Sequence, residues 1–121
     1  MIKKVGAVVW RSSKVQDMLN FYRTIGIPLD HDTHEGEGHT PHYEADLAGV
    51  HYALFESLED STLESNTDTT LIGFEVDNLI SLMSKLAHMN VKFRNALEQT
   101  PWGKRIVVFD PDGRPVELYQ P

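Results

Sequence analysis

Glu117 is the first candidate for a chemical role, and it lies near the end of the chain in residues 116–119, which have the pattern of a strand. Residues 110–113 (Asp-Pro-Asp-Gly) have the residue types of a tight turn and follow a β-rich segment at 105–109, so a terminal β-hairpin is predicted. Because side chains alternate along a strand, Glu117 and Tyr119 should lie on the face opposite to their apolar neighbours. In a pocket, Glu117 could act as a general base or hydrogen bond to a ligand, whereas on an open surface it would be a solvated glutamate.

Five further side chains could help to bind a ligand. His51, in a predicted strand, could ligate a metal or exchange protons with Glu117, although a partly exposed strand histidine is the simpler interpretation. Three aromatic rings offer flat surfaces for a planar molecule, and each could equally belong to the core. Arg105 could bind a carboxylate or a phosphate. The predicted ligand-binding residues are His51, Phe55, Trp102, Arg105, Glu117 and Tyr119, with Glu117 as the catalytic candidate.

A polar segment from residue 31 to residue 42 contains many potential metal ligands. Its histidines and carboxylates do not have the spacing of a compact metal motif. Adventitious surface binding, or a flap over a nearby groove, is the favoured interpretation. The residues concerned are His31, Asp32, His34, Glu35, Glu37, His39, His42 and, just beyond, Glu44.

The composition narrows the class of protein. The chain has 121 residues, of which 40% are hydrophobic, and this fits one globular domain with a substantial core. A net charge of −7, without a cluster of Lys or Arg, argues against nucleic-acid binding. The absence of cysteine excludes disulfides, thiolate nucleophiles and zinc–thiolate sites. No apolar run has the length of a membrane span or of a signal sequence, so we expect a cytoplasmic protein that does not bind membranes.

The first half of the chain has the pattern strand, helix, then further strands. A strand is predicted at 5–10, and Ser13 has capping-box spacing to Gln16. The helix that follows has one apolar stripe and stops at Gly26, which is suited to the left-handed conformation. A hairpin is predicted from strands at 43–47 and 51–55.

The second half repeats this pattern 64 residues later. A strand is predicted at 71–76, Asp77 or Asn78 can cap a second helix, Asn90 can stop it, and another strand should start at 91–93. Each half is therefore predicted to be β-α-β-β-β. We expect a single domain over residues 1–121, with half-repeats at 1–57 and 69–121 joined by a linker at 58–68.

Motifs spread along the chain resemble those of one family. They are residues 20–27 (Asn-Phe-Tyr-Arg-Thr-Ile-Gly-Ile), residues 74–78 (Phe-Glu-Val-Asp-Asn), the pair Trp102-Gly103 and residues 110–118 (Asp-Pro-Asp-Gly-Arg-Pro-Val-Glu-Leu). By these motifs the chain resembles the vicinal oxygen chelate superfamily of glyoxalases, bleomycin-resistance proteins and extradiol dioxygenases. The resemblance implies an α+β fold in which two β-α-β-β-β modules form a cleft, and it implies a homodimer.

Metal-dependent members of that family place their ligands on the first and last strands of each half. Matched by the flanking motifs, these four positions are Ala7, Ala53, Leu71 and Glu117. Only Glu117 can coordinate a cation, whereas three or four protein ligands are usual. We therefore expect no metal cofactor.

The resemblance and the residues together favour a protein that binds a small organic molecule in the cleft without the usual metal. One alternative is a glyoxalase-type lyase or dioxygenase with an altered metal site built on Glu117, His51 and His42. Another is a non-catalytic scaffold that binds a protein partner. The sequence leaves open whether the protein is an enzyme.

Overall fold

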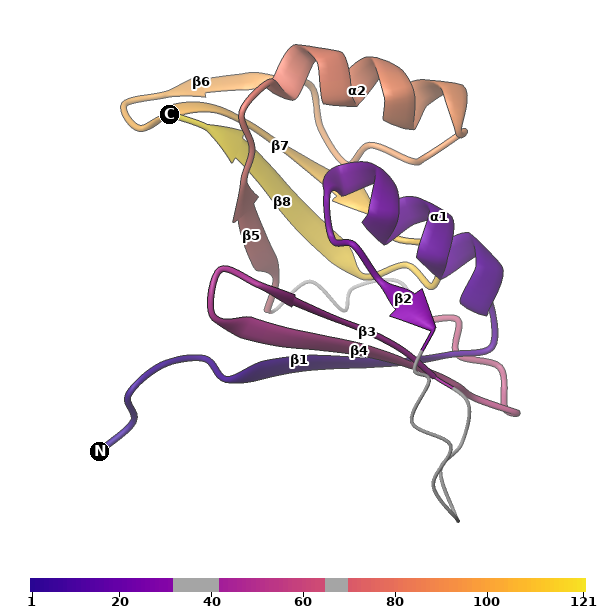
Figure 1. The fold of residues 1–121 in the computed structure, drawn as a ribbon. Helices are drawn as coiled ribbons and strands as arrows, with labels where there is room; N and C mark the ends of the chain where they lie inside the picture. The colour runs from indigo at the N-terminus through magenta and orange to yellow at the C-terminus, as the bar shows by residue number, and fades with distance from the viewer. Residues whose placement is uncertain (32–41, 65–69) are drawn as a thin grey trace. The chain divides into compact units, whose positions relative to one another are not determined.

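The chain forms two compact units, which are described separately. The computed structural model describes residues 1–31, 42–64 and 70–121 (Figure 1). Unit 1 comprises Met1–Ser61 and unit 2 comprises Thr62–Pro121. The boundary falls within the predicted linker 58–68, of which residues 65–68 lie outside the described part of the chain.

Unit 1 is a four-stranded mixed sheet with one helix. The strand order is β1-β4-β3-β2, with β1 parallel to β4 and the other neighbours antiparallel. The hairpin predicted from 43–47 and 51–55 is confirmed. In chain order the elements are β1 (Ala7–Ser12), α1 (Val15–Ile25), β2 (Asp30–His31), β3 (His42–Leu47) and β4 (Val50–Glu56).

The apolar stripe of α1 packs on one face of this first sheet. The Tyr22 ring of α1 stacks on Trp10 of β1 with 4.1 Å between ring centroids, and Trp10 stacks on Tyr52 of β4 at 5.8 Å. Gly26 ends the helix as predicted, in the left-handed conformation at φ 118°. The predicted capping box is wrong, since Ser13 bonds through its N–H and its hydroxyl to Ser61 and Lys14 precedes the helix without a side-chain cap.

Unit 2 repeats this topology, as the sequence predicted. The strand order of the second sheet is β5-β8-β7-β6, with β5 parallel to β8 and the others antiparallel. The helix stops Gly26 and Asn90 are 64 residues apart, and Asn90 also has positive φ, at 61°. The elements are β5 (Ile72–Glu75), α2 (Leu79–His88), β6 (Glu98–Thr100), β7 (Gly103–Phe109) and β8 (Pro115–Gln120).

Helix α2 covers one face of the second sheet. Asn78 caps it by accepting a hydrogen bond from the Ser81 N–H at 3.0 Å, which confirms one of the two predicted caps. The Leu79 N–H donates to the side-chain oxygen of Gln120 on β8 at 2.8 Å. This bond shows that the Gln120 side chain lies on the face of β8 that α2 covers. Three leucines of the helix are buried, at positions 79, 82 and 86.

The predicted terminal hairpin is confirmed, and its turn is held by a buried carboxylate. Asp110 Oδ1 accepts hydrogen bonds from the N–H groups of Asp112, at 2.9 Å, and Arg114, at 3.0 Å. Gly113 takes φ 95°. The strand predicted at 91–93 is wrong, because only an isolated bridge from Phe93 to Val108 forms there and β6 lies later in the sequence.

Candidate functional site

The candidate site is built on the face of the second sheet that points away from α2, called here the far face. Side chains alternate along β8, so the buried residues Val116 and Leu118 lie on the α2 side while Glu117 and Tyr119 lie on the far face. Tyr119 is in register with Glu75 of β5 and Arg105 of β7, and Arg105 is in register with Glu98 of β6. A row of charged and aromatic side chains on the far face therefore extends across all four strands of the sheet.

Arg105 joins two carboxylates on this face. Its Nε donates to Glu117 Oε1 at 3.0 Å, and its Nη1 donates to Glu98 Oε2 at 2.8 Å. The hydrogen bonds to Glu117 and Glu98 raise the pKa of Arg105 above its usual value. The guanidinium thus holds Glu117 in place. The positive charge of Arg105 is already compensated by these two carboxylates.

A hollow of about 310 Å³ opens beside this ion pair. The Trp102 side chain stands at its rim and is 80% exposed. The turn that carries Trp102 is fixed by Thr100, whose hydroxyl accepts from the Trp102 N–H at 3.2 Å and donates to the Gly103 carbonyl at 2.8 Å. The residues that line the hollow are Thr100, Trp102, Gly103, Lys104, Arg105, Glu117 and Tyr119.

Four of the six predicted ligand-binding residues line this one hollow. They are Trp102, Arg105, Glu117 and Tyr119. The sequence analysis missed Glu98, because no strand was predicted around it. Glu75 was seen only as part of a family motif, since its position beside Tyr119 depends on the β5–β8 register.

The other two predicted residues, His51 and Phe55, belong to unit 1. By alternation along β4, His51 lies on the face of the first sheet opposite to Tyr52, with Nδ1 2.9 Å from Asp46 Oδ1 and Nε2 3.4 Å from Glu44 Oε2. The hydrogen bond to Asp46 raises the pKa of His51 above its ordinary value, and Glu44 adds to this. The Phe55 ring stacks on His42 at 4.5 Å.

The sequence motifs match the family's four metal positions to Ala7, Ala53, Leu71 and Glu117. Ala7, Ala53 and Leu71 have no side-chain lone pair, and Glu117 is held by Arg105. Within residues 1–31, 42–64 and 70–121, no group of three or more His, Cys, Asp or Glu side chains is arranged to hold a cation. In the His31–His42 segment, residues 32–41 lie outside the described part, and these include Asp32, His34, Glu35, Glu37 and His39.

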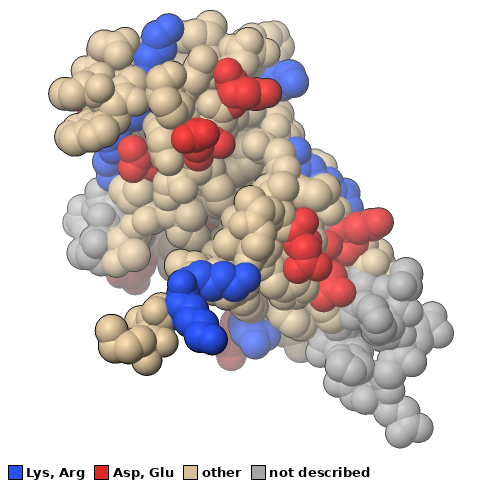
Figure 2. All heavy atoms as spheres, turned by 60° about the vertical axis from the view of Figure 1, so that its left-hand side comes forward, with Lys and Arg blue, Asp and Glu red and all other residues tan. Residues whose placement is uncertain are grey.

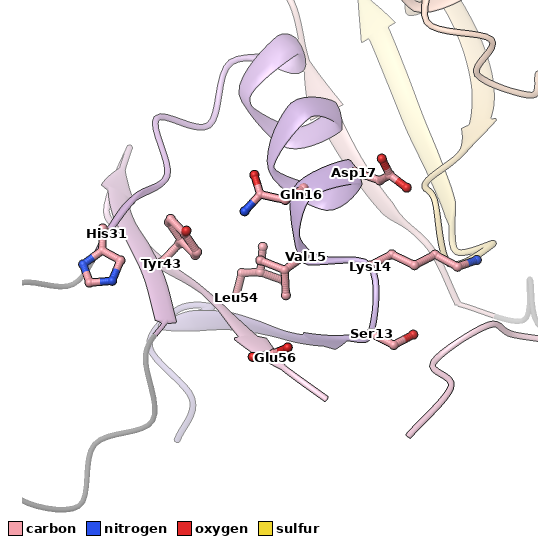
Figure 3. A pocket seen from close by; sticks show the side chains of 9 residues that line it. All are labelled: Ser13, Lys14, Val15, Gln16, Asp17, His31, Tyr43, Leu54 and Glu56. Atoms are coloured by element: carbon pink, nitrogen blue, oxygen red, sulfur yellow. The ribbon is translucent and has the colours of Figure 1, made fainter. Parts of the chain in front are cut away.

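A second hollow, of about 400 Å³, lies at the start of α1 and was not predicted from the sequence. Figure 3 shows Val15 and Leu54 in its middle, Tyr43 and His31 on one side, and the ends of Lys14 and Asp17 directed away from that side. Its lining is mixed in charge. Ser13, Gln16 and Glu56 complete the lining.

Side chains of both charges, Lys and Arg as well as Asp and Glu, occur on the face of the molecule drawn in Figure 2. None of the helices in the described part of the chain has the length and apolar character needed to cross a membrane.

Comparisons with known proteins agree with this fold. The family model of the Glyoxalase/Bleomycin resistance protein/Dioxygenase superfamily matches residues 4–118, which is nearly the whole chain. The chain therefore belongs to this superfamily. The resemblance seen in the sequence motifs is confirmed, and so is the α+β fold. Among curated proteins, no sequence matches significantly.

Solved structures with this fold cover the chain almost completely. A glyoxylase/bleomycin resistance protein/dioxygenase domain from Frankia sp. EAN1pec is 17% identical over 99% of this chain and 98% of its own, with a TM-score of 0.73. A glyoxalase family protein from Enterococcus faecalis is 22% identical over 98% of both chains, with a TM-score of 0.70. The fosfomycin resistance protein FosX from Listeria monocytogenes is 15% identical over 100% of this chain and 93% of its own, with a TM-score of 0.76. At these identities the likeness is one of fold.

Proposed function

We propose that this protein binds a small organic molecule in the hollow on the far face of the second sheet. The observation that carries the proposal is Trp102, which is 80% exposed at the rim of a hollow of about 310 Å³. An exposed indole adds little to the core, whereas a ligand stacked on it would remove a large apolar surface from water. The volume lies at the lower end of the range of about 300–1,000 Å³ for ligand pockets, which favours a small ligand.

The remaining lining residues define how such a ligand would be oriented. Tyr119 adds a second aromatic surface, and Glu117 adds an acceptor whose position is fixed by Arg105. A few polar groups set in an apolar surround are typical of specific ligand sites. The best ligand would be flat and would carry a hydrogen-bond donor for Glu117.

The proposal includes binding without the family's metal. It is supported by residue type, because Ala7, Ala53 and Leu71 have no ligand atoms where the resemblance places them. A cytoplasmic location and a homodimer remain predictions. The fosfomycin-resistance neighbours do not indicate the ligand, because 15% identity supports the fold alone.

A ligand screen followed by tryptophan fluorescence tests this function. The chain has two tryptophans, and Trp10 is buried at 4% exposure while Trp102 is exposed. A ligand in the hollow should therefore change the emission of Trp102. We expect Trp102→Ala to weaken binding by at least about tenfold, as is common when a central aromatic anchor is lost.

The matched control is Ile80→Ala, which removes an exposed apolar side chain from α2, on the opposite side of the second sheet. This variant should bind the ligand as the wild type does. Equal binding by wild type and Trp102→Ala, measured by calorimetry, would refute the assignment of the hollow. A screen that finds no ligand would favour the alternative of a scaffold for a protein partner.

A further inference from the structure

The far face of the second sheet carries carboxylates on three of its four strands. Glu75 shares this face, because it lies two residues after Gly73, which is in register with Glu117. Glu98 and Glu117 also lie there, as their bonds to Arg105 show. Glu75, Glu98 and Glu117 thus lie on the same face as the Arg105 guanidinium, which hydrogen bonds to two of them.

The charge of Lys104 is directed away from this face. Lys104 is in register with Gln120, and the Gln120 side chain accepts a hydrogen bond from Leu79 of α2. Alternation along β7 therefore directs the Lys104 side chain toward the α2 side, although the residue contributes to the rim of the hollow.

Glu117 has room to meet a ligand. A Cβ atom on Gly73 would lie 3.6 Å from Glu117 Oε2, and because the residue is glycine that place is empty. Arg105 holds the other carboxylate oxygen, Oε1. Oε2 is therefore the Glu117 oxygen that we expect to accept a hydrogen bond from a ligand, on the side where Gly73 has no side chain.

The aromatic residues at the hollow also favour positive charge. Trp102 is 80% exposed beside Tyr119, and the face of an indole ring attracts cations by its quadrupole. This observation is independent of the carboxylates. An anionic ligand would instead meet the Glu117 carboxylate and the guanidinium of Arg105, which already has two carboxylate partners.

We propose that the ligand of this hollow is a cation, namely a protonated amine or an amidinium group carried on a flat apolar ring. This inference rests on the proposed function and names the class of ligand. The flat ring would stack on Trp102, and the cationic N–H groups would donate to Glu117 Oε2.

Three probes with the same ring and different charge test the inference. They are benzamidinium, benzamide and benzoate, which are positive, neutral and negative at pH 7. We expect benzamidinium to bind at least about tenfold more tightly than benzamide, and benzoate to bind most weakly. Raising the salt concentration should reduce the preference for benzamidinium, because salt screens exposed charges.

Charge variants should move this preference in both directions. Glu117→Gln and Glu75→Gln should reduce the affinity ratio of benzamidinium to benzamide, while Arg105→Gln should increase it. General damage to the fold would not increase the ratio. Glu59→Gln makes the same charge change on an exposed residue of unit 1 and should leave the ratio unchanged.

The cation assignment and the proposed function can fail separately. If benzamidinium binds no better than benzamide, or does not bind at all, the ligand class is wrong. If a neutral or anionic molecule from the screen then still depends on Trp102, the hollow is a ligand site for another class. If benzamidinium does not bind and no molecule from the screen depends on Trp102 for binding, the hollow is not a ligand site.

Discussion

At the scale of single residues, the candidate site depends on Gly103. Its φ of +128° belongs to a conformation that L side chains rarely adopt, and an added Cβ would overlap the backbone oxygen of Gln120. Glycine permits the close approach of the β6–β7 turn to the end of β8. This approach places Trp102 at the rim of the hollow.

The change Gly103→Ala should therefore reduce both stability and ligand binding. We expect a loss of about 2–4 kcal/mol in the free energy of unfolding, from backbone strain and overlap together. Urea denaturation measures it. Gly6→Ala is the control, since a Cβ there meets nothing within 4 Å, and it should change stability by less than about 0.5 kcal/mol. Equal stability of the two variants would contradict this account of the turn.

At the scale of elements, the β3–β4 hairpin contains a pH-sensitive contact between strands. Asp46 and His51 are directly opposite each other, and His51 Nδ1 lies 2.9 Å from Asp46 Oδ1. The pKa of His51 is raised from 6.5 in the folded protein, mainly by this hydrogen bond. The contact therefore stabilises the fold fully below pH 6.5, and this contribution is lost as the pH rises through the folded-state pKa.

We expect His51→Gln to be less stable than the wild type below pH 6.5 and to approach it at alkaline pH. The difference should stay below about 1 kcal/mol, because both partners are substantially exposed to solvent. Thermal denaturation at a series of pH values measures it. Asp46→Asn should show the same loss at low pH, and a pH-independent difference in both variants would mean that the charge of His51 is not involved.

The elements also show how far the sequence could predict this structure. The two helices were predicted because an apolar stripe ends at a residue suited to positive φ, Gly26 or Asn90. The capping box failed because Ser13 bonds to Ser61, 48 residues away, and local spacing does not report such a partner. Strand β6 was missed because its three residues, 98–100, are polar and have no hydrophobic alternation.

At the scale of the whole molecule, the repeat of 64 residues predicted the correct β-α-β-β-β order in both halves, and the family resemblance implied the α+β fold. Alternation along the predicted last strand indicated which residues of β8 share a face. The repeat could not give the Glu98–Arg105–Glu117 contacts or the hollow, because these depend on register between strands and on side-chain conformation. The identity of the ligand could not be predicted either, because it depends on the shape and charge of the hollow, which only the folded sheet defines.

The same repeat leads to a prediction for the metal content of the whole protein. Family ligands would come from both halves, yet Ala7, Ala53 and Leu71 have no ligand atoms and Glu117 already accepts a hydrogen bond from Arg105. One carboxylate does not make a tight divalent site, since three or four protein ligands are usual. We expect purified, tag-free protein incubated with nickel, zinc, iron or manganese to retain much less than one equivalent by elemental analysis. Glu117→Gln should behave identically. One equivalent of metal in the wild type that is lost in Glu117→Gln would overturn metal-free binding and support a lyase or dioxygenase with an altered site.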